Sequence, residues 1–244
     1  MTPPPAPQPA PPEALLLDFY GTLVHEPTDV ITAICEEVRR TVPDPDAVTA
    51  ADVATLWWRG FRERTGRAHG PAFRTQRDID RAALAAAVSR LGSGADPDAL
   101  VERQYAHRRR PPLHPDARAL LATGIPACLV SNIDRADLDA ALAHHGLRDR
   151  FAAVVTSEDA RSYKPRPEMF TEALRLLGRA PGEVLHVGDS FSSDVAGAAA
   201  VGIPAAWVNR TGRAAPEGPR PAYEVATLAA LPPLLGQPVP SRHP

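Results

Sequence analysis

Three apolar runs in this chain of 244 residues end in polar side chains that could take part in chemistry. Asp18 follows the run 14–17, Ser131 follows the run 127–130, and Asp189 comes just after the run 184–187. Such runs are typical of strands buried on both faces of a parallel sheet. Because the carboxyl ends of parallel strands meet at one edge, we expect these three side chains to converge on one site.

The residues near these strand ends add charge and backbone freedom. Gly21 permits a sharp turn after Asp18, and Thr22 brings a hydroxyl close to that carboxylate. A third carboxylate, Asp194, follows Asp189 at short spacing. Three clustered carboxylates raise one another's pKa unless a cation lies among them, and Mg²⁺ prefers such hard oxygen ligands. The cluster therefore predicts a magnesium site.

Lys164 is the single lysine among the 27 lysine and arginine residues of the chain. Where a positive charge alone is needed, this chain carries arginine, so the lysine indicates a place that needs a compact ammonium group. Pro165 and Pro167 fix the backbone beside it and favour the start of a helix.

Over residues 14–235 the chain resembles the haloacid dehalogenase-like (HAD) hydrolase superfamily, with all four motif positions present in order. The matching segments are Leu-Asp-Phe-Tyr-Gly-Thr-Leu, Leu-Val-Ser-Asn, Ser-Tyr-Lys-Pro-Arg-Pro and Gly-Asp-Ser-Phe-Ser-Ser-Asp. The resemblance implies an α/β fold, in which a doubly wound parallel sheet (the Rossmann-like HAD core) carries a smaller all-helical cap domain.

The same resemblance implies the role of each site residue. Asp18 is the expected nucleophile of a Mg²⁺-dependent phosphatase, which forms an aspartyl-phosphate that water then hydrolyses. The substrate would be a small phosphorylated metabolite. The expected catalytic residues are Asp18, Tyr20, Ser131 and Lys164; the expected metal ligands are Asp18, the Tyr20 backbone carbonyl, Asp189 and Asp194; the expected substrate contacts are Thr22, Ser131, Asn132 and Lys164.

Tyr20 stands where most phosphatases of the superfamily carry a second aspartate, which protonates the leaving group and activates water. Its replacement would slow the reaction by roughly 10²- to 10⁴-fold, the usual size of general acid–base catalysis. Three substitutes are open. Tyr20 itself is one, although a phenol with a pKa near 10 is a poor base at neutral pH. His25 or Glu26, in the loop that follows, is another, and a good leaving group would need no acid.

Two alternatives to the phosphatase remain. Tyr20 also matches the Asp-x-Tyr-Gly-Thr-Leu pattern of the superfamily's dehalogenases, which form an ester on Asp18 without a metal and bind the halide through a cap arginine, here Arg39 or Arg40. Two acidic residues in the fourth motif are needless for that chemistry, and this favours the phosphatase. The second alternative is a catalytically weak protein that binds a phosphorylated ligand.

The elements that position these residues alternate between helix and strand after residue 115, as in a parallel sheet. Strands are predicted near 127–130, 152–155, 184–187 and 205–208. Residues 25–108 contain four helical patterns and no strand pattern, so we predict a cap domain inserted between core segments 13–24 and 109–235. The candidates to face the substrate from the cap are Trp57, Trp58, Arg62 and His69.

Composition places the chain among globular proteins. A formal charge of −2 gives no basic surface for nucleic acid, and no apolar run is long enough to span a bilayer. The proline-rich residues 1–12 lack the pattern of a secretion signal and are predicted to be a disordered tail, and residues 236–244 a loose one. Two distant cysteines predict no disulfide framework. We therefore expect a cytoplasmic protein; the oligomeric state is not predicted.

Overall fold

A computed structural model describes residues 11–236, and a six-stranded parallel sheet lies at its centre. The strand order is β3-β2-β1-β4-β5-β6, so the direction of winding reverses between β1 and β4. The crevice at such a reversal is where open α/β sheets bind their ligands. The strands are β1 (Ala14–Leu17), β2 (Ala127–Ser131), β3 (Ala153–Thr156), β4 (Val184–Gly188), β5 (Ala205–Val208) and β6 (Tyr223–Val225).

The apolar strands form because both faces of the sheet are covered. Along β1, Leu15 and Leu17 pack into one hydrophobic cluster, while Leu16 packs into a second cluster on the opposite face. This alternation is the period of two that a strand imposes on its side chains. The helices α5 (Ala117–Leu121), α6 (Arg135–His145) and α10 (Leu231–Leu234) contribute to the first cluster, and α8 (Glu168–Leu177) and α9 (Ala196–Ala200) to the second.

The predicted fold class is confirmed, with small differences in detail. The four later strands lie at the predicted positions to within one residue. The segment near the C-terminus contains the edge strand β6, which pairs with β5 and was not predicted as a strand. The predicted tails, 1–12 and 236–244, fall almost entirely outside the described residues.

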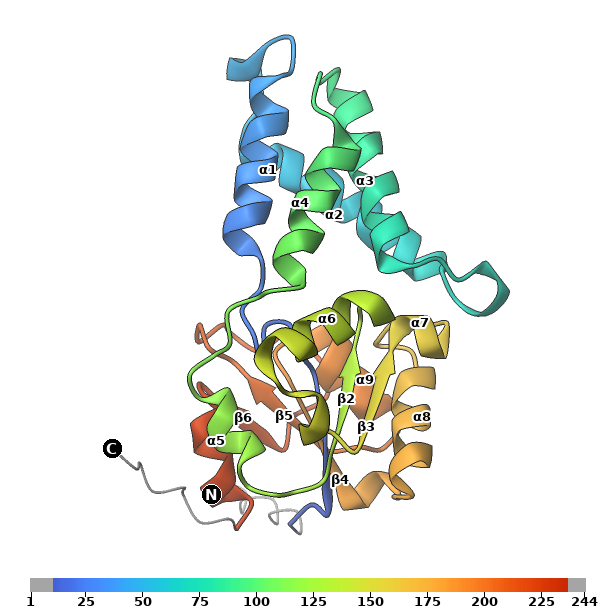
Figure 1. Cartoon of the computed structure of the whole chain (residues 1–244), viewed down its shortest axis with the longest axis vertical. Helices are drawn as coiled ribbons and strands as arrows, with labels where there is room; N and C mark the ends of the chain where they lie inside the picture. The colour runs from blue at the N-terminus through green and yellow to red at the C-terminus, as the bar shows by residue number, and fades with distance from the viewer. Residues whose placement is uncertain (1–10, 237–244) are drawn as a thin grey trace.

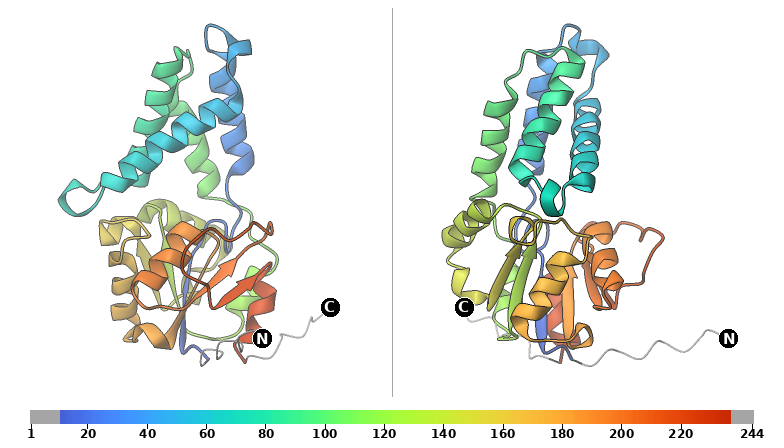
Figure 2. Two further views of the ribbon diagram at one scale, coloured as in Figure 1. Left: turned by 180° about the vertical axis from the view of Figure 1, so that it is seen from behind. Right: turned by 90° about the vertical axis from the view of Figure 1, so that its right-hand side faces the viewer.

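Residues 28–108 form a bundle of four helices at the edge of the sheet where the strands end (Figures 1 and 2). Helix α2 begins at a capping box made by Thr49 and Asp52, and α3 ends at Gly92 in the left-handed conformation. The α1–α4 bundle consists of α1 (Thr28–Arg40), α2 (Ala50–Arg67), α3 (Gln76–Leu91) and α4 (Pro97–Arg108).

Two chain segments join the bundle to the sheet, and they lie side by side. Val24 pairs with Leu113 in an antiparallel bridge, and the backbone N–H of His25 donates to the Pro112 carbonyl at 2.9 Å. The domain boundaries at residues 24 and 108–109 stay a prediction. Among the described residues, the structure contains no helix that is long and apolar enough to cross a membrane.

Candidate active site

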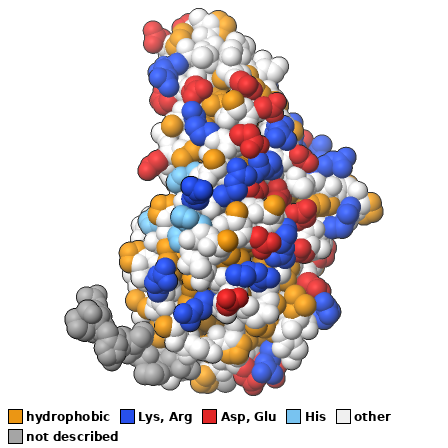
Figure 3. All heavy atoms as spheres, in the orientation of Figure 1, with side chains coloured by type: hydrophobic (Ala, Val, Ile, Leu, Met, Phe, Trp, Pro, Cys, Tyr) orange, Lys and Arg blue, Asp and Glu red, His pale blue; other side chains and the backbone are white. Residues whose placement is uncertain are grey.

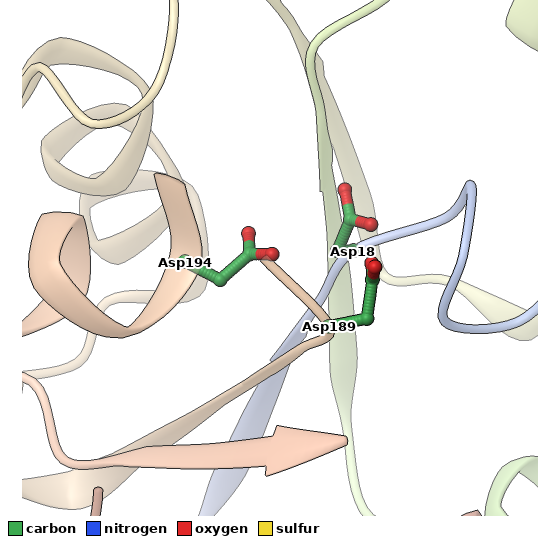
Figure 4. Close-up of side chains that lie close together, drawn as sticks. All are labelled: Asp18, Asp189 and Asp194. Carbon is green, nitrogen blue, oxygen red and sulfur yellow. The ribbon is translucent and has the colours of Figure 1, made fainter. Parts of the chain in front are cut away.

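The three predicted carboxylates meet at the point where the sheet reverses. Asp18 follows β1, Asp189 follows the neighbouring strand β4, and Asp194 lies in the π-helical turn η5 (Phe191–Val195). Each offers an oxygen atom, and these atoms lie within 4.8 Å of one another. Figure 4 shows the Asp18 and Asp189 carboxylates next to each other, with Asp194 facing them from the other side. The predicted convergence of Asp18 and Asp189 is therefore present in the fold.

Lys164 lies at the centre of this cluster, with a side chain that is only 2% exposed. Its ammonium nitrogen donates to Asp18 Oδ1 at 2.7 Å, to Asp194 Oδ1 at 2.6 Å and to the Val130 carbonyl at 2.9 Å. All three donors of an ammonium group are thus used. A guanidinium group is planar and larger, so it would not fit among these three acceptors. This explains why the chain has a lysine here and arginine elsewhere.

Asp194 is held by the protein on both of its oxygens. Oδ1 accepts from Lys164 and lies 3.0 Å from His186 Nε2, and Oδ2 accepts from the Ser190 backbone N–H at 3.0 Å. Burial opposes ionisation, but Lys164 and His186 hold the pKa of Asp194 well below its usual range. Asp194 therefore acts on the cluster as a fixed negative charge that orients Lys164.

The pKa values of Asp18 and Asp189 are shifted in the opposite direction, upward. Burial raises the pKa of Asp18 to about 7; Lys164 opposes this rise and Asp194 adds to it. Burial and the neighbouring Asp18 and Asp194 raise the pKa of Asp189 to about 8. Within residues 11–236, the Asp189 carboxylate has no cationic partner; its one hydrogen bond comes from the Thr22 hydroxyl at 3.2 Å. Hard oxygen donors with excess negative charge are the ligand set that suits Mg²⁺.

Asp189→Asn is expected to stabilise the metal-free protein while removing its response to Mg²⁺. A carboxyl whose pKa rises on folding makes the folded state less stable as the pH increases, here from about 4 to about 8. The variant lacks this loss, so its free energy of unfolding at pH 8 should exceed that of the wild type by about 1–3 kcal/mol. Thermal unfolding with EDTA at pH 4 and pH 8 measures the difference, which should vanish at the lower pH. A variant that is still stabilised by Mg²⁺ would contradict the assignment.

The turn after Asp18 requires glycine. Gly21 has a positive φ of 83°, and a Cβ atom there would lie 2.5 Å from Asp189 Oδ1. The turn directs the Thr22 hydroxyl to a position 3.3 Å from Asp18 Oδ2 and 3.2 Å from Asp189 Oδ1. Thr22 therefore bridges the two carboxylates and lies in the candidate site. Its predicted contact with a substrate stays a prediction.

Ser131 and Asn132 differ in what they do. Ser131 ends β2 with 2% of its surface exposed, and its hydroxyl makes no hydrogen bond in the part of the chain that the structure describes. Asn132 instead holds the backbone of Lys164, accepting from its N–H at 2.8 Å and donating to its carbonyl at 3.2 Å. Asn132 therefore positions Lys164 in this structure, and its predicted contact with the substrate stays a prediction.

The geometry is against the predicted acid–base role of the Tyr20 side chain. Its hydroxyl donates to the backbone carbonyl of Arg108 at 2.7 Å, at the end of α4. Burial raises the pKa of Tyr20 far above its usual value, so the phenol is a weaker acid here than in water. Tyr20 links the nucleophile's strand to the α1–α4 bundle, and only its backbone carbonyl is left as a predicted metal ligand.

His25 and Glu26, the other proposed acid–base groups, line a pocket of about 550 Å³ that also reaches Asp189. The His25 ring lies against that of His114, with centroids 3.8 Å apart. His107 lines the same pocket, and histidine side chains gather at this boundary between bundle and sheet in Figure 3. Burial and the nearby Arg210 lower the pKa of His114 to about 4, so it is neutral at pH 7.

The bundle residues predicted to bind the halide or to face the substrate are not gathered at the candidate site. Arg39 and Arg40 lie at the end of α1 that is far from the sheet (Figure 1), and Arg39 pairs with Glu36 there. The structure therefore contradicts their role as halide-binding groups. Trp57 is buried between the helices, whereas Trp58 is 60% exposed and stacks on Phe61. Arg62 and His69 are exposed as well.

Sequence reasoning missed three residues close to the site. His186, fully buried in β4, supports Asp194, and its position in the middle of an apolar strand was a signal. Asp134 caps α3 from the sheet side, accepting from the backbone N–H of Gln76 at 2.7 Å and of Arg77 at 3.0 Å. Arg108 packs over the Tyr20 ring, with its guanidinium carbon 5.0 Å from the ring centroid.

A doubly wound sheet with three carboxylates and a lysine at its reversal, beneath a helical bundle, defines a class of hydrolases. The family model of haloacid dehalogenase-like hydrolases matches residues 12–202, and the chain belongs to this family.

The relatives whose names state an activity include both phosphatases and 2-haloacid dehalogenases. Phosphoserine phosphatase of Thermus thermophilus is 40% identical over 129 residues, 49% of this chain and 49% of that protein. (S)-2-haloacid dehalogenase of Xanthobacter autotrophicus is 30% identical over 205 residues, 81% of this chain and 75% of that protein. The solved structure of L-2-haloacid dehalogenase from the same organism aligns with a TM-score of 0.70 at 26% identity, covering 92% of this chain and 98% of that one. The chain spans about half the length of the first two curated relatives that it matches.

Proposed function

We propose that this protein is a Mg²⁺-dependent phosphatase that acts on a small phosphorylated metabolite. The observation that carries the proposal is Asp189, a buried carboxylate beside Asp18 with no cationic partner among the described residues. Lys164 is the one cation that pairs with Asp18 and Asp194 among the described residues, so a third carboxylate adds uncompensated negative charge unless a further cation binds there. Hydrolysis of a halide from carbon has no use for that cation, whereas transfer of a charged phosphoryl group does.

In the proposed reaction, Asp18 attacks the phosphorus atom and the bond to the leaving-group oxygen breaks, which leaves a phosphoryl group on Asp18. Water then attacks phosphorus and releases inorganic phosphate, which restores the carboxylate. Lys164 offsets negative charge on the transferring group, and Ser131 has a hydroxyl available for one of its oxygens. Asp18, Asp189 and the Tyr20 carbonyl would hold Mg²⁺, which would neutralise charge there and lower the pKa of Asp18. Asp194, the fourth expected ligand, has its two oxygens engaged by Lys164, His186 and the Ser190 N–H.

The proton on the leaving group has two sources compatible with the structure. His25 and Glu26 share a pocket with Asp189, so either can reach a substrate bound there. A leaving group that is already a weak base needs neither. The α1–α4 bundle serves in this proposal as the cap that closes over the site and excludes water.

A metal-independent 2-haloacid dehalogenase is the second candidate, favoured by the similarity to the Xanthobacter autotrophicus enzyme and by Tyr20 at its position in the first motif. Asp18 would then attack carbon and displace halide. The cytoplasm is the proposed location for either enzyme, and the two free cysteines, Cys35 and Cys128, suit a reducing compartment.

One assay separates the candidates. The protein is incubated with a panel of phosphomonoesters and, separately, with 2-chloropropionate, each in Mg²⁺ and in EDTA. Release of phosphate only with Mg²⁺ is the expected result. Release of chloride in EDTA would replace the phosphatase by the dehalogenase. Release of neither product, together with tight binding of inorganic phosphate, would make the protein a binding protein.

A further inference from the structure

A group of buried polar side chains in the α1–α4 bundle lacks hydrogen-bond partners. Each of the four is less than 9% exposed and has an atom without a partner within residues 11–236. The atoms are Trp57 Nε1, Gln76 Oε1, Gln104 Oε1 and Arg108 Nε. Buried polar groups are nearly always hydrogen-bonded in folded proteins, so unpaired groups here point to a ligand. The two glutamine oxygens are acceptors, and the donor in this group that carries a charge is the Arg108 guanidinium.

Arg108 is the charged member of this group. It is 92% buried (8% exposed), and its guanidinium makes no hydrogen bond and no ion pair with any residue that the structure describes. Its contacts are the faces of Tyr20 and Tyr105, whose ring centroids lie 5.0 Å and 5.9 Å from the guanidinium carbon. Burial opposes its charge, but the nearby Glu26 and Asp80 hold the pKa of Arg108 above its usual value, although neither forms an ion pair with it within the described residues. Asp80 accepts from the Tyr105 hydroxyl at 2.9 Å. The guanidinium therefore keeps its hydrogen-bond donors free within the described residues, and a carboxylate from outside the chain would accept from them.

Two members of this group, Arg108 and Gln76, are hydrogen-bonded through their backbones to loops of the candidate active site. The Arg108 carbonyl accepts from Tyr20, two residues after the nucleophile Asp18. The backbone N–H of Gln76 donates to Asp134, in the loop that begins at Ser131. Arg108 and Gln76 therefore contact the loops that follow β1 and β2, respectively. Figure 1 shows the end of α4 at this boundary between the bundle and the sheet.

We propose that Arg108 binds a carboxylate of the substrate while the phosphate lies at Asp18. The inference rests on the proposed function and narrows it: the substrate is a small phosphomonoester of a hydroxy acid. A carboxylate suits the site better than a second phosphate, because one guanidinium matches a single negative charge. Asp80 nearby would repel a dianion.

The test compares two phosphomonoesters, 3-phosphoglycerate and glycerol 3-phosphate, which differ in a carboxylate against a hydroxymethyl group. The wild type is expected to prefer the carboxylate. In Arg108→Met, which keeps an apolar stem but loses the charge, the ratio of the two kcat/KM values should fall roughly 30-fold or more, mainly through KM. Arg108→Lys should lie between them, and Arg103→Gln, on the exposed side of the same helix, should keep the wild-type ratio.

Two results overturn the proposal: a wild type without preference, and an unchanged ratio in Arg108→Met. Phosphate release from neither ester would instead count against the proposed function. The carboxylate site is then judged by calorimetric titration with D-glycerate, for which Arg108→Met should bind at least about tenfold more weakly than the wild type. Equal affinity, or no binding to the wild type, overturns the proposal.

Thermal unfolding separates binding from a purely structural role. Because the guanidinium makes no hydrogen bond and no ion pair within the described residues, Arg108→Met is expected to change the Tm little. Binding sites are commonly less stable than a sequence optimised for folding alone, whereas a structural cation stabilises its surroundings. A clear fall in Tm, with both esters affected equally, would identify a structural arginine and overturn the proposal.

Discussion

Asp18→Asn should abolish phosphate release, lowering kcat by at least about 10⁴-fold, the scale seen when a nucleophile is removed from a catalytic unit. The amide of asparagine cannot attack phosphorus, although it has nearly the shape of the carboxylate. Asparagine can still accept from Lys164, whose ammonium donates to Asp18 Oδ1 at 2.7 Å in the wild type. The variant should therefore fold, and steady-state release of inorganic phosphate measures the loss.

The same variant distinguishes an enzyme from a binding protein. Wild-type protein mixed rapidly with a labelled phosphomonoester and quenched in acid should carry label on Asp18, and Asp18→Asn should carry none. Asp98→Asn serves as the matched control, because it also removes one negative charge, at an exposed carboxylate of α4 outside the candidate site. Unchanged affinity for the phosphorylated ligand together with equal turnover in Asp18→Asn would refute covalent catalysis.

The fold could be predicted because its signals are local. Four uncharged apolar residues before Asp18 indicate a strand buried on both faces, and the structure buries all four. Glycines such as Gly146 and Gly178, both in the left-handed conformation, mark where helices end. The edge strand β6 escaped prediction because its three residues follow a segment rich in proline and glycine and alternate in burial. A strand so short is fixed by pairing with β5 more than by its own sequence.

In the candidate site, only the residues at the motif positions could be predicted. Asp18, Asp189 and Lys164 stand at motif positions, so their convergence followed from the strand order. Arg108 and Asp134 act through contacts with residues far away in the chain: 88 residues separate Tyr20 from Arg108, and 58 separate Gln76 from Asp134. Nothing local distinguishes Arg108 from the other arginines of the bundle. Arg108 differs from them because it is buried without a hydrogen-bond partner among the described residues, and a sequence does not show this.

Lys164→Met is expected to destabilise the protein by about 3–5 kcal/mol, in addition to abolishing activity, because it leaves buried charges without their partner. Asp18 and Asp194 both accept from this ammonium, and Asp194 is 1% exposed. Urea unfolding with EDTA at pH 7 measures the loss. Arg175→Met, which breaks an ion pair with the exposed Glu172, should change little and controls for the loss of a positive charge.

A second variant decides whether charge or packing explains that loss. Asp194→Asn removes one of the two carboxylates that Lys164→Met leaves unpaired, so the double variant should recover part of the stability while remaining inactive. Recovery is possible only if an uncompensated charge was the cause, since asparagine restores no volume at position 164. Additive losses in the double variant would show that Lys164 contributes chiefly by filling space. The same electrostatic argument gives Asp189→Asn the opposite sign, because Asp189 has no cation of its own in the folded chain and gains stability only when one binds.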